Sequence, residues 1–569
     1  MLHARPRRVH ASELFARRFE DHDGIESRLQ QTQQAVERRE HSRSRFAARR
    51  SQDARAFQHV RFALLRDAAT ILKRAHATVH AKRIGANAAT ENRQNDPTGD
   101  VHRRTVPISA PRQPSIPAAA LEANRSAIAL REQGRIAEAA QRFREAVEAA
   151  PHAPEFRVNL AVTLADAGDE RAAESEYREA LALDPDSAAA ALGLGALLVR
   201  LGRFDDARPV YERVLTSDPQ NAQANLAMYE LEQIAGNPAK ALEHQARVLR
   251  RQTLFSEPAV QEQRSVLVLL APGDWQANVP VDFLIDRRTT TLHKLYVLNE
   301  PQIEAAAFPH AGVLFVAIAE CDENEPRLRL AQRVIERTGL PVINRPERIA
   351  LTNRVRAAKL LQGIEAAIVP QTHRVSRDDA MRGASLPPFP IVIRPVGSQA
   401  GKDLERVRDA AELNEYLARV AGGEFFVMPF VDFSKDDGYF RKYRIIIVDG
   451  EPIAYHLAIS PRWMIHYYNA PMREHAWMRE EERRFLEHFE DVFSETLRAA
   501  LREIARRLEL EYVGVDCSID REGRLVLFEA DPAMIVHAGD DPALFSYKFP
   551  AAHRVFAAFE RLVQRVGSR

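Results

Sequence analysis

The sequence contains little cysteine and no long hydrophobic run. Cys321 and Cys517 are the two cysteines among 569 residues. Two are too few for a disulfide framework, so we expect a reducing, cytoplasmic compartment. The longest apolar runs, at 266–272 and 312–319, are under ten residues, whereas a transmembrane helix needs about 20. We therefore expect no membrane-spanning segment and no membrane partner.

The composition is otherwise that of a globular protein. It is 45% hydrophobic and 28% charged, which excludes collagen-like, mucin-like and wholly disordered chains. The length corresponds to three or four domains at roughly 150 residues each. No arrangement of residues suggests a nucleophilic serine or cysteine.

Positive charge is concentrated at the start of the chain. Residues 1–110 hold 22 Lys and Arg against 12 Asp and Glu, whereas the remainder holds 58 against 67. No binding motif or interleaved aromatic residues accompany the basic runs. We therefore expect residues 1–116 to be a disordered basic arm and linker, or the product of a start codon assigned too far upstream. A nucleic-acid partner is not expected.

A period of 34 residues runs through residues 117–252. A glycine marks the turn between two helices, an alanine permits their close approach, a proline ends the second helix, and an aromatic residue recurs until Gln245 breaks its series. The positions are Gly134, Gly168, Gly202 and Gly236; Ala139, Ala173, Ala207 and Ala241; Pro151, Pro185 and Pro219; Phe143, Tyr177 and Tyr211.

This period is that of the tetratricopeptide repeat. It predicts an all-α solenoid, whose surface is suited to binding a protein or peptide. Oligomerisation or packing between subunits is the alternative role.

Residues 263–350 alternate short β-branched runs with helical stretches. Strands are expected at 265–270, 294–298, 313–319 and 341–344, and a helix at 327–338, which together predict a small parallel sheet. The loop after the first strand, APGDWQANVP (271–280), lies where open α/β sheets bind ligands, or is an ordinary connection.

A glycine-containing loop, PVGSQAGK (395–402), follows a predicted strand at 390–394. Gly397 and Gly401 permit backbone N–H groups to fold over phosphates, and Ser398 and Lys402 can add donors. A surface hairpin would have the same features.

Two further strands follow this loop. In the first, at 425–433, Met428, Pro429 and Phe430 could offer backbone groups and a flat wall to an adenine, or form a buried core strand. In the second, at 441–450, Lys442 and Arg444 share one face. A solvated strand face is the alternative for this pair.

An acidic hairpin is expected at 512–531, with its turn at 520–523. If Ile519 pairs with Arg524, then Asp516 lies opposite Leu527 and diagonal to Glu529. Cys517 then points into the core on the opposite face.

In this hairpin Asp516, Glu529 and Asp531 share a face, which Gly514 and Ser518 leave open. Carboxylates grouped in this way suit Mg²⁺. The alternative is a solvated acidic turn.

In this order the motifs resemble the ATP-grasp superfamily, in particular the branch of ribosomal-protein glutamate ligases and glutathione synthetases. The resemblance covers about residues 265–569, and the segment 340–360 is similar to the entry into the central domain. It implies an α/β pre-ATP-grasp domain at 263–350 and an α+β ATP-grasp domain at 351–569. With the repeats, the expected fold class is therefore multidomain.

The resemblance also implies roles for individual residues. Arg394 would contact phosphate, Arg444 would face phosphate or acyl-phosphate beside Lys442, and a lid would cover the phosphates. Two positions depart from the family pattern, because Arg394 replaces the usual Lys and Asp531 the commoner Asn. The lid would comprise Gly397, Ser398 and Gly401; the adenine hinge Met428, Pro429, Phe430 and Val431; the Mg²⁺ ligands Asp516, Glu529 and Asp531.

The implied function is an ATP- and Mg²⁺-dependent ligase that joins a carboxylate to an amine through an acyl-phosphate, with the repeats binding a protein or peptide. Two alternatives are an ATP-grasp phosphotransferase and a non-catalytic repeat scaffold with a nucleotide-binding domain. His466, in an aromatic loop at 462–469, is either an acid/base on the substrate side or a structural histidine.

Overall fold

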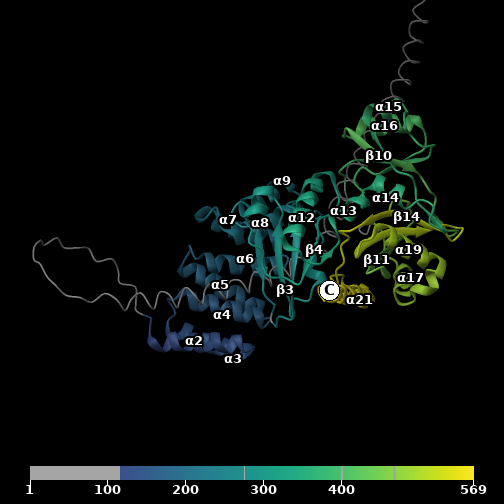
Figure 1. Ribbon diagram of the computed structural model, residues 1–569. Helices are drawn as coiled ribbons and strands as arrows, with labels where there is room; N and C mark the ends of the chain where they lie inside the picture. Colours follow the sequence, from purple (N-terminus) through teal and green to yellow (C-terminus); the bar gives the residue numbers. More distant parts are fainter. Residues whose placement is uncertain (1–115, 260, 275, 399–400, 466–468, 569) are drawn as a thin grey trace, which may run out of the picture. The chain divides into compact units, whose positions relative to one another are not determined.

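The computed structural model describes residues 116–259, 261–274, 276–398, 401–465 and 469–568. The expectations for the basic arm and for His466 lie outside these residues. A helical repeat region is followed by a mixed α/β region, which confirms the predicted multidomain fold class (Figure 1). None of the described helices is long and apolar enough to cross a membrane.

The repeat region is a series of helix pairs in which consecutive helices pack together. The glycines of the 34-residue period lie in the turns within the pairs, at φ between 74° and 85°, a conformation that favours glycine. The recurring alanines and aromatic rings are buried. The helices are α2 (Ala118–Glu132), α3 (Ile136–Ala149), α4 (Pro154–Asp166), α5 (Glu170–Leu183), α6 (Ala188–Arg200), α7 (Phe204–Ser217), α8 (Ala222–Ile234) and α9 (Pro238–Leu249).

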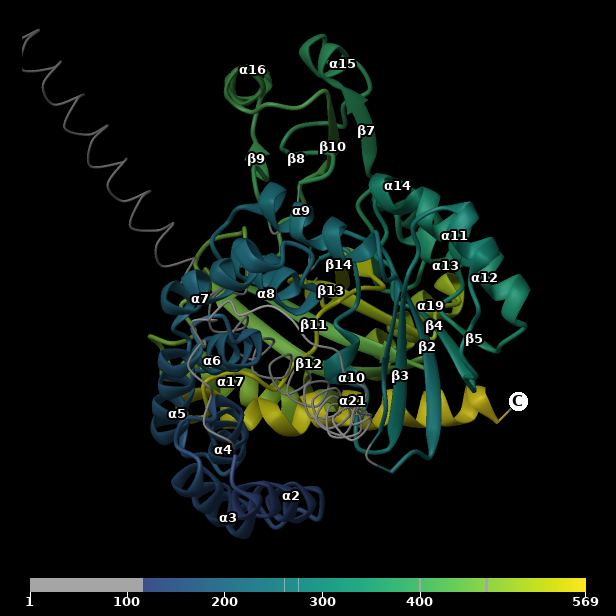
Figure 2. The ribbon, with the colours of Figure 1, turned by 90° about the vertical axis from the view of Figure 1, so that its left-hand side faces the viewer.

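The first sheet has the strand order β1-β3-β2-β4-β5. Four strands are parallel, as predicted, and β1 adds an antiparallel edge that the sequence did not indicate. Figure 2 shows α12 alongside β4 and β5. The elements are β1 (Leu254–Glu257), β2 (Arg264–Leu270), α10 (Val281–Leu284), β3 (Thr290–Tyr296), α11 (Glu300–Ala305), β4 (Val313–Val316), α12 (Glu325–Thr338) and β5 (Val342–Ile343).

The second sheet is antiparallel, with the order β7-β10-β8-β9. Helix α16 covers one face with Leu413, Tyr416 and Leu417. Short helices lead into this sheet from the first. The elements are α13 (Pro346–Ile349), α14 (Arg354–Leu360), β7 (His373–Ser376), α15 (Arg377–Met381), β8 (Ile391–Pro395), β9 (Glu405–Val407), α16 (Ala410–Arg419) and β10 (Glu424–Pro429).

The third sheet has the order β12-β11-β13-β14-β6, and its last pair is parallel. Apolar side chains of α17 and α19 pack against one face, and at one end of the other face α21 packs against both this sheet and the first. The elements are β6 (Ala367–Ile368), β11 (Phe440–Val448), β12 (Glu451–Ser460), α17 (Ala476–Glu487), α18 (Phe489–Val492), α19 (Glu495–Leu508), β13 (Tyr512–Ile519), β14 (Leu525–Asp531), α20 (Pro542–Phe545) and α21 (Phe549–Gly567).

Candidate active site

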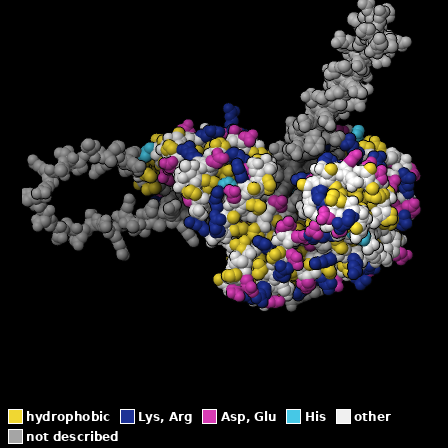
Figure 3. All heavy atoms as spheres, turned by 90° about the horizontal axis from the view of Figure 1, so that it is seen from above, with side chains coloured by type: hydrophobic (Ala, Val, Ile, Leu, Met, Phe, Trp, Pro, Cys, Tyr) yellow, Lys and Arg dark blue, Asp and Glu magenta, His cyan; other side chains and the backbone are white. Residues whose placement is uncertain are grey.

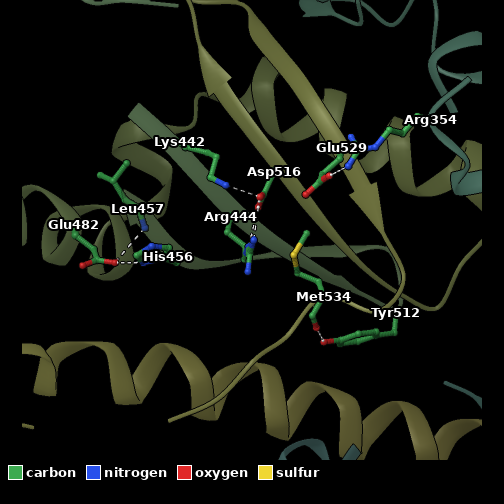
Figure 4. A network of polar contacts seen from close by, with 10 residues as sticks. All are labelled: Arg354, Lys442, Arg444, His456, Leu457, Glu482, Tyr512, Asp516, Glu529 and Met534. Carbon is green, nitrogen blue, oxygen red and sulfur yellow. Dashed lines mark hydrogen bonds and ion pairs between the residues drawn. The ribbon is translucent and has the colours of Figure 1, made fainter. Parts of the chain in front are cut away.

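A row of charged residues crosses the third sheet on the face away from α17 and α19. Arg444 of β11 is the register partner of Asp516 of β13, which is in turn the partner of Glu529 of β14. Lys442 lies two residues before Arg444, so both basic side chains project from the same face of β11. Figure 4 shows both of them directed toward Asp516. Strand β11 therefore positions Lys442 and Arg444 beside Asp516. The alternative, that these two side chains form a solvated strand face, is wrong.

Asp516 is buried and fully engaged by these two cations. Arg444 donates from Nε to Oδ1 at 2.8 Å and from Nη2 to Oδ2 at 3.0 Å, and Lys442 Nζ donates to Oδ2 at 2.9 Å. The side chain of Asp516 is 2% exposed. Burial alone would raise the pKa of Asp516, but the charges of Arg444 and Lys442 outweigh it and hold that pKa well below its usual range.

The register of the acidic hairpin differs from the prediction by one residue. Ile519 pairs with Leu525 rather than with Arg524. The chain turns back later than expected because Arg524 belongs to the turn, where its N–H donates to Asp520 Oδ1 at 2.8 Å. The proposed pairing of Asp516 with Leu527 is therefore wrong.

A β-bulge between Asp516 and Cys517 restores the predicted common face. On the turn side of the bulge Cys517 pairs with Leu527, whereas beyond it Asp516 pairs directly with Glu529. Phe528 is the extra residue on β14. Without it, strict alternation would place Glu529 opposite Val515, on the face covered by helices. The predicted burial of Cys517 on that face is confirmed.

The face expected to be open at Gly514 is covered. A Cβ atom on Gly514 would lie 2.3 Å from Cβ of Met534. The Met534 carbonyl also accepts a hydrogen bond from Tyr512 Oη at 2.9 Å (Figure 4). At the next site along the face, buried Ser518 donates to the Arg441 carbonyl at 2.7 Å. The segment after β14 thus closes one side of the charged row.

Glu529 has a partner that the sequence did not indicate. Arg354, at the start of α14, donates from Nη2 to Glu529 Oε2 at 2.5 Å (Figure 4). The side chains of Arg354 and Glu529 are 25% and 31% exposed. Burial would raise the pKa of Glu529, but the charge of Arg354 more than offsets it, and the pKa lies below its ordinary value. The sequence signal that could have pointed to Arg354 is the Asn-Arg pair at 353–354, in the segment that resembles the entry into the ATP-grasp domain. Asn353 caps α14, which begins at Arg354.

Asp531 differs from the other two carboxylates. It is the register partner of Gly514, and its Oδ1 accepts a hydrogen bond from the Ala533 N–H at 2.8 Å. Burial and the neighbouring charge of Glu529 raise the pKa of Asp531 to about 6. The like charge of Glu529 disfavours ionisation of Asp531, in addition to burial.

Among the described residues, no group of three or more His, Cys, Asp or Glu side chains is arranged to hold a metal ion. The donor set nevertheless fits Mg²⁺, because one or two carboxylates commonly hold this ion together with substrate phosphates. Glu529 and Asp531 repel each other and would supply those oxygens. Asp516 stays a predicted ligand, although its oxygens accept hydrogen bonds from Lys442 and Arg444.

The glycine-containing loop connects β8 to β9 and begins beside a buried arginine. Arg394 Nε donates to Ser398 Oγ at 3.1 Å, and its Nη2 donates to the Ser398 carbonyl. Burial, together with the charge of Arg354, lowers the pKa of Arg394 to about 10, so the guanidinium stays charged at neutral pH. Gly397 and Gly401 have φ of 78° and 70°. Lys402 follows in an exposed turn.

The expected adenine hinge ends β10. Met428 pairs with Val392 of β8, and the Phe430 N–H donates to the Pro390 carbonyl at 2.9 Å. That N–H is therefore engaged within the chain. The guanidinium of Arg406 lies 4.7 Å from the centroid of the Phe430 ring. Met428, Pro429, Phe430 and Val431 are all partly exposed, unlike the preceding core residues of the strand.

A buried histidine on the edge strand β12, beside the charged row, was not singled out from the sequence. His456 of β12 is the register partner of Arg444, and its Nδ1 lies 2.5 Å from Oε1 of Glu482 on α17 (Figure 4). The same Oε1 accepts a hydrogen bond from the Leu457 N–H at 3.1 Å. Burial lowers the pKa of His456. This pair fixes β12 next to Arg444.

Comparison with known proteins assigns the first part of the described chain. Residues 124–188, 163–222 and 192–254 match the family model of the tetratricopeptide repeat. No curated protein matches the chain. Among solved structures, MamA from Desulfovibrio magneticus is 21% identical over 24% of this chain and 77% of that chain, with a TM-score of 0.23.

Other solved structures are similar to the α/β region. A D-alanine–D-alanine ligase from Bacillus anthracis is 14% identical over 54% of this chain and 98% of that chain, with a TM-score of 0.34. A RimK domain protein, described as ATP-grasp, from Sphaerobacter thermophilus is 14% identical over 52% of this chain and 99% of that chain, with a TM-score of 0.33. The chain combines tetratricopeptide repeats with an α/β region that is similar to ATP-grasp ligases.

Proposed function

We propose that the chain is an ATP- and Mg²⁺-dependent ligase that joins a carboxylate to an amine through an acyl-phosphate. The observation that carries the proposal is the charged row, in which Lys442 and Arg444 pair with Asp516 on one side and Arg354 of α14 pairs with the neighbouring Glu529 on the other. Cations held in place by buried carboxylates are suited to the negative charge that develops during phosphoryl transfer.

The neighbouring elements supply the remaining parts of a nucleotide site. Arg394 is a buried cation at the base of the β8–β9 loop, and this loop would cover the phosphates. Met428 to Val431 would border the adenine. Bound to Glu529 and Asp531, Mg²⁺ would neutralise phosphate charge and polarise the transferred phosphoryl group.

The reaction needs orientation and charge stabilisation rather than a protein nucleophile. A carboxylate oxygen of the substrate attacks the γ-phosphorus of ATP, and ADP leaves with the electrons of the bridging bond. The amine nitrogen then attacks the acyl carbon, phosphate leaves, and the amine loses a proton. Arg444 and Lys442, held in place by their ion pairs with Asp516, would balance the charge of the acyl-phosphate.

Positional isotope exchange tests the first step. ATP labelled with ¹⁸O in the β–γ bridge is incubated with the full chain, Mg²⁺ and a panel of free amino acids and dicarboxylic acids. We expect scrambling of the label that depends on one class of carboxylate and is lost in Arg444→Gln. Phosphate found on a hydroxyl, or no scrambling with any carboxylate, would contradict a ligase.

We propose further that the repeats bring a protein or peptide substrate to this site. A stack of helix pairs presents an extended surface of the kind that solenoids use for binding. The full chain would be purified with its bound partner, the partner identified by mass spectrometry, and its mass followed after ATP is added. A mass increase that requires ATP supports the proposal, and an unmodified partner contradicts it.

A further inference from the structure

Arg354 forms an ion pair with Glu529, one of the carboxylates that the proposed function assigns to the metal. The guanidinium comes from the start of α14 and meets Glu529, 175 residues later in the chain, at 2.5 Å. Arg354 and Glu529 are the charged side chains that Figure 4 shows on the far side of Asp516 from Lys442. In this state a cation from the protein already neutralises Glu529.

The ion pair of Arg354 with Glu529 can separate more readily than those that Asp516 forms with Lys442 and Arg444. Asp516 is 2% exposed and accepts three hydrogen bonds from two cations, so its separation would leave uncompensated buried charge. Arg354 and Glu529 are joined by one hydrogen bond and are each at least a quarter exposed. Water and ions can therefore compete for the Arg354–Glu529 pair, which is the exchangeable one.

The balance of charge around Glu529 favours an anion over a free metal ion. Glu529 already has the Arg354 guanidinium as its partner, and Asp516 already accepts from Lys442 and Arg444. Arg394 is a further buried cation, at the start of the β8–β9 loop. Guanidinium groups bind phosphate oxygens through paired N–H donors, so a polyphosphate could compete with Glu529 for Arg354.

We propose that Arg354 makes metal binding and nucleotide binding interdependent. Without nucleotide, its charge stays on Glu529 and keeps a divalent cation away. When a nucleotide is present, the guanidinium pairs with a phosphate, and Glu529 becomes available to the metal. This inference rests on the proposed nucleotide site, and it adds a regulatory role for Arg354 in that site.

The test measures Mn²⁺ binding to the full chain by electron paramagnetic resonance, with and without a non-hydrolysable ATP analogue. In the wild type we expect the analogue to tighten Mn²⁺ binding about tenfold, and Mn²⁺ to tighten analogue binding by the same factor. In Arg354→Gln we expect Mn²⁺ alone to bind about tenfold more tightly than in the wild type, so that the coupling largely disappears. Arg354→Met is expected to behave in the same way and serves if the first variant does not fold.

The matched control is Arg356→Gln. Arg356 lies two residues along the same helix, is exposed, and donates to the Ala350 carbonyl at 3.3 Å. This variant should keep the wild-type coupling. Equal Mn²⁺ affinity of wild type and folded Arg354 variants in the absence of nucleotide would overturn the inference, as would uncoupled binding in the wild type.

Failure of the inference can be told apart from failure of the ligase proposal. If isotope exchange is absent but the analogue and Mn²⁺ bind cooperatively through Arg354, the ligase proposal fails and the inference stands. If isotope exchange occurs but Mn²⁺ and the analogue bind independently, the inference fails and the ligase proposal stands. A wild-type chain that binds neither ligand contradicts both.

Discussion

At the scale of single residues, the buried carboxylate of Asp516 is expected to contribute strongly to the stability of the fold. It is buried between Arg444 and Lys442, so Asp516→Asn leaves two cations without their carboxylate. We expect a loss of about 3 kcal/mol in the free energy of unfolding. Glu529→Gln should cost no more than about 1 kcal/mol, because its pair is partly exposed. Urea denaturation followed by circular dichroism measures both, and equal losses would contradict this difference.

The raised pKa of Asp531 predicts how the free energy of unfolding depends on pH. Its folded pKa of about 6 lies above the value of about 3.9 expected in the unfolded chain. The folded state therefore binds this proton more tightly than the unfolded state does. The resulting stabilisation of the fold is fully present below about pH 4 and is lost as the pH rises through about 6. Asp531→Asn should remove this dependence and gain about 1–2 kcal/mol over the wild type at pH 7. Unfolding free energies of both proteins at pH 4, 5.5 and 7 test this, and parallel curves would contradict it.

The strand face on which a side chain lies was easier to predict from the sequence than the contacts that the side chain makes. Two-residue alternation predicted that Lys442 and Arg444 share a face, and they do. The role of Arg354 could not be inferred in this way, because its partner is 175 residues away. Pairing of that kind depends on how separate elements pack together.

At the scale of elements, the β13–β14 hairpin shows why strand register was the weakest prediction. The strand limits follow from β-branched residues and the turn at 520–523, and the structure places the strands there. The local sequence gives no signal for the bulge at Phe528; in the fold the ring of this residue lies against Phe433, with the centroids 4.8 Å apart. This extra residue keeps Glu529 on the face of Asp516.

The contact of β13 with the segment after β14 gives a prediction for this element. A Cβ on Gly514 would lie 2.3 Å from Cβ of Met534, so Gly514→Ala must displace backbone. We expect a loss of about 2–3 kcal/mol in unfolding free energy. Gly523→Ala is the control, because its added Cβ meets nothing within 4 Å and only the positive φ of 78° is unfavourable, at a cost of about 1 kcal/mol. Thermal unfolding compares the two variants, and an equal or smaller loss for Gly514→Ala would be evidence against the close contact.

At the scale of the whole molecule, the large repeating features were predictable and the combined core was not. The 34-residue period predicted the helix pairs because each repeat contains both the glycine of its turn and the residues that pack between its helices. In contrast, Phe315 of the first sheet, Tyr512 of the third and Phe559 of α21 contact one another, and nothing in their local sequences indicates this. On the face shown in Figure 3, basic and acidic side chains of the described residues are intermixed.

The magnesium dependence of ATP affinity tests the central claim most directly. Isothermal titration of the full chain with ATP, in Mg²⁺ and in a chelator, should show one site whose affinity rises about tenfold with the metal. In Glu529→Gln this gain should fall to less than about twofold, whereas Arg356→Gln should keep it. Absence of saturable ATP binding in the wild type, or an undiminished magnesium effect in Glu529→Gln, would contradict the account.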